Sequence, residues 1–561
     1  MPTDAELFAS ARAHCHSAHD WQHYADQLYS KGRFAAAVVG YDQAVALDPT
    51  ALHAHHNKAA ALYQLARLEE ALTACDVALA LAAGIAEIHK TRASILQELG
   101  RSDEALGEYA QALALKPDFY EAHHHRASLL RSQKRYDEAL LHADLAIALR
   151  PSAAEAYANR AHVLLGLLCA EEALTAIDTA IALAPDMPQA HSDRGDIFQQ
   201  LDRYDDALVS YDRAISLAPG YAEAHHNKGF LLQFLGDDVG ARAAYDCAIA
   251  LKPDFARAYF NKATLALLEG DFAEGWPLYE WRWQQSEQKA ARNFMQPLWL
   301  GDEDINDKTI LLHAEQGFGD TLQFCRFVQG VAARGAHVVL EVPPPLAALM
   351  ATLPGDYRLV NKGETLPLFD VHCPLMSLPL ALGTTLATLP APVPYLHAPA
   401  EKRAQWAERL GEKHAPRLGL CWSGAAVHKN DRHRSLPLST LAPLLDLGFE
   451  AHALQKDIRA GDGAALGSIR THAEQLQDFT DTAALIEAMD LVITVDTSVA
   501  HLAGALGKPV WIMLPFTPDY RWLRVRADSP WYPSARLFRQ PTIGDWQSAI
   551  SAVVSALNLW R

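Results

Sequence analysis

The sequence is poor in cysteine and in basic charge. It has 7 cysteines in 561 residues, none in a Cys-x-x-Cys pair, and 49 Lys and Arg against 67 Asp and Glu, a formal charge of -18. Scattered cysteines of odd number exclude a disulfide framework and a cysteine-based zinc site. The acidic balance argues against a nucleic-acid binder and against docking on an anionic membrane, because both need a basic face. We therefore expect a reduced, cytoplasmic protein.

A long uninterrupted apolar run is also lacking. The first residues, MPTDAELFASARAHCH, contain acids and no apolar signal-peptide core. The stretch 373–395 carries no charge, but five prolines interrupt it, and a spanning helix needs about 20 continuous residues. We expect a soluble chain without membrane insertion, in which this stretch forms a buried strand and a proline-rich connection.

The first half of the sequence is a repeat with a period of 34 residues, running from about residue 20 to residue 283. Each unit is expected to form two amphipathic helices. Small residues would let the helices approach closely, and a proline would stop the second helix. The prolines at this spacing, interrupted only by Ala83, are Pro49, Pro117, Pro151, Pro185, Pro219 and Pro253.

This pattern resembles the tetratricopeptide repeat, which has Trp, Tyr, Ala and Pro at fixed offsets. The first unit matches with Trp21, Ala37, Tyr41, Ala44 and Pro49. Seven full units and a truncated eighth are expected. Such repeats stack into a superhelix whose concave face is lined by the first helix of each unit.

One polar position recurs at the same phase of every unit, and four of its eight members are asparagine: Asn57, Asn159, Asn227 and Asn261. A carboxamide donates and accepts, so an asparagine ladder can pair with the backbone of an extended peptide. Arrays of the O-GlcNAc transferase type look similar in this respect. The alternative is a row of polar helix-surface residues exposed to water. The many histidines at neighbouring phases favour partly buried helix positions over a metal site.

The second half alternates short apolar runs with helical patterns, which predicts parallel sheets with right-handed crossovers. The pattern restarts after residues 390–394, indicating two Rossmann-like lobes that face a cleft. A single helix is expected over residues 321–335. The fold class is thus an all-α repeat superhelix followed by an α/β domain of two Rossmann-like lobes. The expected divisions are an N-terminal extension (1–19), the repeat array (20–283), a connector (284–308), a first lobe (309–395) and a second lobe with C-terminal helices (396–561).

A glycine turn with an acid lies between the first strand and helix of the first lobe. Gly317 and Gly319 permit a tight turn and close approach of a ligand, and Asp320 would point into the cleft. The residues alone favour a helix-capping role for Asp320.

Three cap-type residues follow a strand of the second lobe. Asp496, Thr497 and Ser498 would begin a helix whose N–H groups and dipole can hold a phosphate, with His501 in its first turn. The alternative is a plain capped helix.

A third glycine turn, Ser423-Gly424, is followed by a basic stretch with Lys429 and Arg434. Cations beside such a turn can neutralise a leaving diphosphate. A solvated loop is the alternative.

With these motifs together, the second half resembles a GT-B glycosyltransferase related to the bacterial heptosyltransferases. The resemblance implies that Asp320 is the catalytic aspartate. It also implies that the segment Asp496-Thr497-Ser498-Val499-Ala500-His501-Leu502 holds a nucleotide sugar, with Ser498 where that family usually has glycine. Lys429 would correspond to a diphosphate-binding lysine, and Gln455 and Lys456 to a further strand end that contacts the donor.

The fusion resembles bacterial protein glycosyltransferases, which include a group acting on flagellin. It implies an inverting transfer to Ser or Thr of a protein acceptor held by the array, with flagellin as one candidate. The donor would be a nucleotide sugar, with no cofactor and no nucleic acid. No Asp-x-Asp motif follows a strand, so a metal-independent reaction is expected. Two alternatives stay open: a lipid or saccharide acceptor with the repeats as an assembly scaffold, and a non-catalytic scaffold with a nucleotide-binding lobe.

Overall fold

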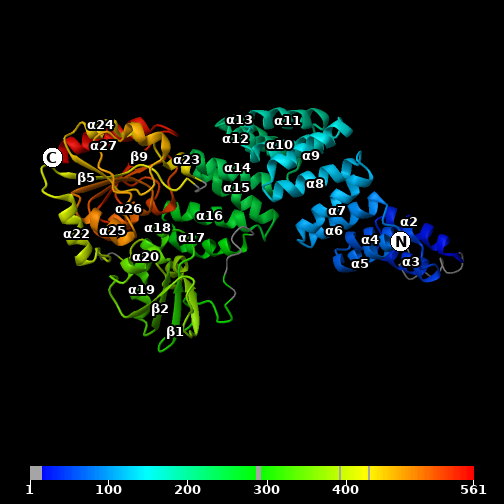
Figure 1. The fold of residues 1–561 in the computed structure, drawn as a ribbon, viewed down its shortest axis with the longest axis horizontal. Coiled ribbons are helices and arrows are strands. Elements are labelled where there is room, and N and C mark those ends of the chain that lie inside the picture. Colours follow the sequence, from blue (N-terminus) through cyan, green and yellow to red (C-terminus); the bar gives the residue numbers. More distant parts are fainter. Residues whose placement is uncertain (1–14, 286–291, 293, 391–392, 427–429, 561) are drawn as a thin grey trace. The chain divides into compact units, whose positions relative to one another are not determined.

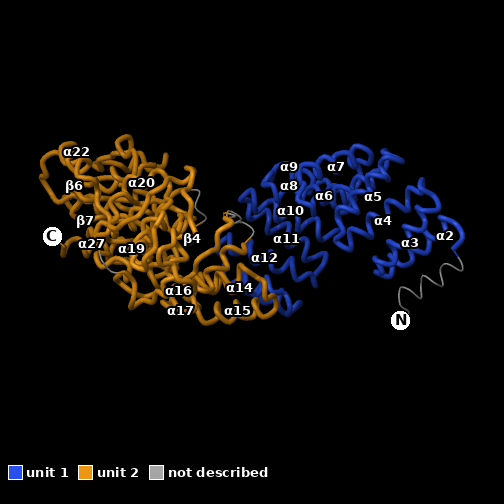
Figure 2. Tube along the Cα trace, turned by 90° about the horizontal axis from the view of Figure 1, so that it is seen from below, with its two compact units in different colours: residues 1–228 blue, residues 229–561 orange. Residues whose placement is uncertain are grey.

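The computed structural model describes residues 15–285, 292, 294–390, 393–426 and 430–560. The chain forms two compact units, residues 1–228 and 229–561, coloured separately in Figure 2. Helix α14 (Ala222–Leu235) crosses from the first unit into the second. No helix in the described ranges is both long enough and apolar enough to cross a lipid bilayer.

Helix pairs at the expected period make up the first unit (Figure 1). The second helix of a pair ends two residues before each predicted proline, as α3 does at Leu47 before Pro49, so this prediction is confirmed. The helices are α2 (Ala18–Ser30), α3 (Phe34–Leu47), α4 (Leu52–Gln64), α5 (Leu68–Leu81), α6 (Ala86–Glu98), α7 (Ser102–Leu115), α8 (Tyr120–Ser132), α9 (Tyr136–Leu149), α10 (Ala154–Gly166), α11 (Ala170–Leu183), α12 (Pro188–Gln200) and α13 (Tyr204–Leu217).

Small residues allow the two helices of a pair to cross closely. A Cβ added at Gly195 would stand 2.4 Å from Cε1 of Tyr211, because that ring lies directly over the glycine. The ring of Tyr211 is fully buried, and its hydroxyl donates to Asp196 Oδ1 at 2.6 Å. The repeated glycine, alanine and tyrosine positions therefore fix the pairing of the helices.

The second unit contains the last repeats and the α/β part. Its array segment consists of α15 (Asp238–Leu251), α16 (Ala256–Glu269), α17 (Phe272–Tyr279) and η1 (Glu280–Gln284). The eighth repeat is thus a helix pair whose second helix is short. Phe272, Trp276 and Tyr279 are buried against the lobes, Trp276 contacting Phe324 and Tyr520 edge to face. The last repeat, α16 and α17, therefore shares one hydrophobic core with the lobes.

Two parallel sheets form the lobes. The first has the order β3-β2-β1-β4 and the second β6-β5-β7-β8-β9. The strands predicted from the apolar runs are present, and β9 is an additional strand. The strands are β1 (Thr309–His313), β2 (His337–Val342), β3 (Tyr357–Asn361), β4 (Val371–Pro374), β5 (Arg417–Cys421), β6 (Glu450–Ala453), β7 (Leu491–Val495), β8 (Val510–Leu514) and β9 (Ala535–Arg539).

The single helix expected over 321–335 is wrong, because the chain there divides into α18, η3 and α19. Cys325 ends α18 and starts a tighter 3-10 turn, and Val328 resumes the α-helix. The lobe helices are α18 (Phe318–Phe324), η3 (Cys325–Phe327), α19 (Val328–Ala332), α20 (Pro344–Met350), η4 (Leu375–Ser377), α21 (Leu378–Ala381), α22 (Ala400–Leu410), α23 (Asp431–Arg434), η5 (Leu438–Leu441), α24 (Ala442–Leu445), η6 (Ala460–Ala465), α25 (Phe479–Glu487), α26 (Ser498–Ala505), η7 (Tyr520–Trp522) and α27 (Trp546–Trp560).

Each sheet has one point at which the chain reverses its direction of travel. In the first sheet the chain moves from β1 outward to β3 and then returns to the other side of β1 as β4; in the second, β5 is flanked by β6 and β7 in the same way. Ligands of open parallel sheets bind at the carboxyl ends of strands beside such a point. The carboxyl ends of β1, β5 and β7 are therefore the places to search for a site.

Candidate functional site

The glycine turn with the acid follows β1 at its carboxyl end. Gly317 is the N-cap of α18, and Asp320 is the third residue of that helix, with its Oδ2 accepting from the Gly317 N–H at 2.8 Å. The N-cap role predicted for Asp320 is therefore taken by Gly317, and Asp320 binds the N–H of that residue from inside the helix. The other oxygen, Oδ1, is paired with the guanidinium of Arg521 from the second lobe.

The second motif follows β7. Thr497 is the N-cap of α26 in extended backbone geometry, but its side chain does not cap the helix N–H groups. Its Oγ1 lies 3.2 Å from Thr494 Oγ1 instead. Ser498 is the first residue of the helix. The start of α26 is thus arranged so that its N–H groups can receive an anion.

The starts of α18 and α26 pack against each other. A Cβ added at Gly319 would stand 2.9 Å from His501 Cδ2 and 3.7 Å from the Cα of Ser498. Close approach therefore requires glycine at this position. His501 itself is buried, with Nδ1 3.0 Å from the Tyr532 hydroxyl and its ring stacked on Trp522. Burial, with help from nearby arginines, holds the pKa of His501 well below its usual range, so the ring is neutral.

Arg521 was missed by the sequence analysis. Besides Asp320, it contacts Asp519 Oδ1 from Nη1 at 2.8 Å and donates from Nε to Gln323 Oε1 at 2.7 Å. Its side chain is buried, with 9% of its surface exposed. The only signal in the sequence is the charged and aromatic run Asp519-Tyr520-Arg521-Trp522 just after a predicted strand.

Asp496 lies beside these charges. Burial, and next the charge of Asp519, raise its pKa to about 6, against the opposing effects of Trp522, Arg434 and Arg521. Arg434 Nη1 donates to the backbone oxygen of Asp496 at 3.0 Å. Asp496 and Arg434 therefore belong to the same charged cluster as Arg521.

The turn after β5 is organised by Gln455. Its Oε1 accepts from the N–H groups of Trp422 and Ser423 at 3.0 and 3.3 Å, and its Nε2 donates to Ser423 Oγ at 3.1 Å. Gly424 lies against Arg434, since an added Cβ there would stand 2.6 Å from Nη2. Gln455 thus shapes this turn rather than facing outward.

The structure does not place two of the predicted donor-binding residues, both lysines, in this cluster. Lys456 is exposed immediately after Gln455. Lys429 lies outside the described residues. Arg459 was not predicted, and it donates from Nη2 to Asp431 Oδ2 at 2.6 Å and to the Gly424 oxygen at 3.1 Å. The basic stretch is therefore tied to the glycine turn through Arg434 and Arg459.

The asparagine ladder makes contacts inside the array. Asn57 Nδ2 donates to Asp26 Oδ1 at 2.9 Å, and the same oxygen accepts from the Tyr41 hydroxyl at 2.6 Å. Five repeats later Asn227 contacts Asp196 in the same way at 3.1 Å, and Asp196 also accepts from Tyr211. In two further ladder positions, Asn159 Nδ2 donates to the His124 backbone oxygen at 3.2 Å, and Asn261 also has a partner. The amides of Asn57, Asn159 and Asn227 thus join successive repeats, and peptide binding by the ladder stays a prediction.

No group of three or more His, Cys, Asp or Glu side chains in the described ranges is arranged to hold a metal ion.

The helix pairs agree with comparisons to known families. Residues 90–154 match the family described as tetratricopeptide repeat, and residues 25–65 and 195–236 match a second one described as TPR repeat. The chain contains tetratricopeptide repeats. The sixteen helices α2 to α17 form the tetratricopeptide superhelix, followed by the two α/β lobes.

A segment of the second lobe is similar to a glycosyltransferase family. Residues 476–528 match the family described as glycosyltransferase family 9 (heptosyltransferase). This range includes β7, α26 and Arg521, the parts that bring Asp496, Ser498 and His501 together.

One curated relative is Protein FlbA of Caulobacter vibrioides, 26% identical over 328 residues. The alignment covers 52% of this chain, and the chain spans about half (53%) of the length of that relative. Among solved structures, a tetratricopeptide repeat protein from Parabacteroides merdae is 17% identical, with a TM-score of 0.38 over 47% of this chain and 98% of its own. Pseudomonas aeruginosa pilF is 21% identical, with a TM-score of 0.34 over 40% of this chain and 99% of its own.

Proposed function

We propose that this chain is an inverting glycosyltransferase that moves a sugar from a nucleotide-sugar donor to a Ser or Thr hydroxyl of a protein acceptor, with flagellin as one candidate. The observation that carries the proposal is the contact between the starts of α18 and α26. It brings Asp320, at the carboxyl end of β1, close to the anion-accepting start of α26 at the carboxyl end of β7. The family 9 match over α26 supports a nucleotide-sugar donor there.

The donor diphosphate would lie over the first N–H groups of α26. Arg434 and Arg521 supply positive charge beside that position, through their places next to Asp496 and Asp320. Fixed donors and cations aimed at a developing negative charge lower the barrier, and loss of one such group typically costs about 2.7–4 kcal/mol. No metal is needed in this scheme.

In the reaction, the acceptor oxygen forms a bond to the anomeric carbon while the bond from that carbon to the phosphate oxygen breaks. The nucleoside diphosphate leaves with the electron pair, and Asp320 takes the hydroxyl proton as general base. A single displacement of this kind inverts the anomeric centre.

In this scheme Arg521 can bind two anions, the Asp320 carboxylate and the donor diphosphate. In the unliganded structure it pairs with Asp320. A bound diphosphate would compete for the same guanidinium, and the loosened carboxylate of Asp320 would become a better proton acceptor. The scheme therefore predicts ordered binding, with the donor before the acceptor.

The acceptor would reach the site along the tetratricopeptide array. Support comes from the last repeats, which belong to the same compact unit as the lobes. Thr517 after β8 donates to the Phe234 oxygen, Arg524 pairs with Asp238 of α15, and the Phe234 ring contacts His433 of the basic stretch at 5.2 Å between centroids. A peptide leaving these repeats would thus pass close to the turn after β5.

The proposal is tested by incubating the full chain with candidate nucleotide sugars and candidate acceptors, flagellin first, and measuring nucleotide release and acceptor mass. We expect release that depends on a protein hydroxyl, and chelation by EDTA should not reduce it. Asp320→Asn should lower kcat by about 10²–10⁴-fold, while donor binding measured by calorimetry is kept or becomes tighter, because Arg521 no longer has the Asp320 carboxylate as a competing partner.

Other outcomes separate the alternatives. Release only with a glycan or lipid acceptor would leave the repeats as a scaffold. Donor binding without release under any acceptor would identify a nucleotide-binding scaffold. Full activity of Asp320→Asn would show that the base is another residue.

A further inference from the structure

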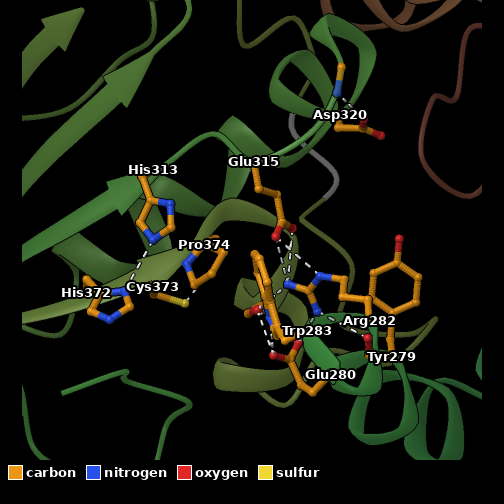
Figure 3. Close-up of polar contacts among 12 residues, drawn as sticks. Tyr279, Glu280, Arg282, Trp283, His313, Glu315, Asp320, His372, Cys373 and Pro374 are labelled. Atoms are coloured by element: carbon orange, nitrogen blue, oxygen red, sulfur yellow. Dashed lines mark hydrogen bonds and ion pairs between the residues drawn. The ribbon is translucent and has the colours of Figure 1, made fainter. Parts of the chain in front are cut away.

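A fully buried arginine joins the end of the array to the turn that leads into α18. Arg282 lies in η1, directly after α17 (Figure 3). Its Nη2 lies 3.1 Å from both carboxylate oxygens of Glu315, and its Nη1 lies 2.6 Å from Glu280 Oε1. Nη2 also donates to Ser377 Oγ at 2.7 Å, and Nη1 to the Tyr279 backbone oxygen at 3.3 Å. With the bond from Nε to Glu315, the whole guanidinium fork is occupied.

The partners of Arg282 come from three segments. Glu280 precedes it in the last turn of the array, Ser377 follows β4, and Glu315 lies in the turn between β1 and α18. Ser377 Oγ also donates to Glu280 Oε1 at 2.9 Å, which closes the network. A lysine could not replace this arrangement, because its ammonium is a point charge without the planar fork that holds two carboxylates at once.

The network contains two carboxyl groups, those of Glu280 and Glu315, and one guanidinium. Burial raises the pKa of Glu315 to about 7, although Arg282 opposes the rise, and the charges of Glu280 and Asp320 add to it. The carboxyl groups of Glu315 and Asp320 therefore interact electrostatically. Glu315 lies five residues before Asp320, in the turn that leads into the same helix. Without the arginine the pKa of Glu315 would rise further, and its carboxyl group would lose the guanidinium that holds it in the turn before α18.

We propose that Arg282 is a positioning residue for the transfer: by holding Glu315 it fixes the turn after β1, and with it the place of the Asp320 carboxylate. The array then contributes to the reaction itself in addition to carrying an acceptor. The kinetic part of this inference rests on the proposed function. The placement part does not, because it concerns only the turn.

The test compares Arg282→Lys and Glu315→Gln with a matched control, Arg417→Lys. Arg417 is also buried and paired with a glutamate, Glu450 at 3.1 Å, but it lies at the opposite end of β5 from the candidate site. In the full chain, amide hydrogen exchange over residues 314–321 should speed up by about tenfold or more in the first two variants and stay unchanged in the control. The kcat of transfer should fall about 10- to 100-fold in the first two variants, with the donor KM changed less than about threefold.

Each outcome decides the inference. Exchange over 314–321 that matches the control in both variants overturns it, as does faster exchange with an unchanged kcat. Should Arg282→Lys not fold, Glu315→Gln gives the same comparison, since it keeps the arginine and the shape of the carboxyl group. A wild-type chain without transfer would contradict the proposed function, and the exchange comparison would still decide whether Arg282 holds the turn.

Discussion

At the scale of single residues, the candidate site depends on one cation that bridges the lobes. Arg521 contacts Asp320 on one side and Asp519 on the other, and Asp496 lies within its electrostatic reach. An arginine can hold such partners and a phosphate in fixed directions, whereas the ammonium of a lysine is a point charge without a planar fork of donors.

We therefore expect Arg521→Lys to lower kcat by about 10²-fold, which corresponds to about 2.7 kcal/mol of barrier. Steady-state nucleotide release gives the rate, and calorimetry should report weaker donor binding as well. Arg536→Lys, on β9 and stacked over Trp511, is the control and should keep the wild-type rate. A wild-type rate in Arg521→Lys would remove Arg521 from the mechanism.

Gly319 is the second residue on which the site depends. Gly319→Ala would place its Cβ against the His501 ring, which is held by Tyr532 and Trp522 and has no room to move. We expect a loss of about 1–3 kcal/mol in the free energy of unfolding, measured with urea. Gly107→Ala, in the middle of α7 with open space around it, should instead gain up to about 1 kcal/mol. Equal stability of the two variants would mean that α18 and α26 do not touch.

At the scale of elements, α8 should make the array sensitive to acid. It carries three consecutive histidines, and burial lowers the pKa of each, that of His125 to about 4; His142 on α9 also falls to about 4. In the unfolded chain these groups titrate near 6.5, so between pH 6.5 and 4 the unfolded state binds more protons. The stability they contribute is present above pH 6.5 and is lost as the pH falls through this window.

Thermal unfolding at pH 7.5 and at pH 5 measures this loss. The melting temperature should be lower at pH 5, and His125→Gln should narrow the difference because one of the protonating groups is gone. An identical difference in wild type and variant would show that His125 is not buried as described.

The elements also show where sequence reasoning succeeds. The 34-residue period and the apolar runs predict the helix pairs and strands β1 to β8, because both patterns are local in the chain. Strand β9 (ARLFR) has two arginines and little apolar signal, and the helix breaks at Cys325 although no proline or glycine stands there. In the site, Asp320 and Asp496 follow predicted strands, but the pair of Asp320 with Arg521 joins residues 201 positions apart. No local pattern reports such a contact.

At the scale of the whole molecule, the compact units do not divide the chain between array and lobes. The last repeats lie in the same compact unit as the lobes. There the ring centroids of Phe272 and Trp531 are 6.0 Å apart, and Trp276 packs edge to face against Tyr520. Removing these helices would expose a large aromatic surface, which promotes aggregation.

A fragment of residues 219–561 should therefore fold alone with a cooperative thermal transition, and a fragment of residues 309–561 should aggregate or lack one. Circular dichroism and size-exclusion chromatography distinguish these results. A stable, monomeric 309–561 fragment would show that α16 and α17 are not part of the core of the lobes.

The trio of asparagine, aspartate and tyrosine that links neighbouring repeats occurs near the start of the array and again five repeats later, with the same atoms in contact. Two repeat interfaces with the same contacts can be exchanged for one another, because each repeat touches only its neighbours. The interface at Asn159 differs, because its amide contacts a backbone oxygen instead. Only where the trio is repeated could a whole block of residues be copied or deleted with the same atoms meeting on both sides, so the length of the array can change in whole repeats at such interfaces.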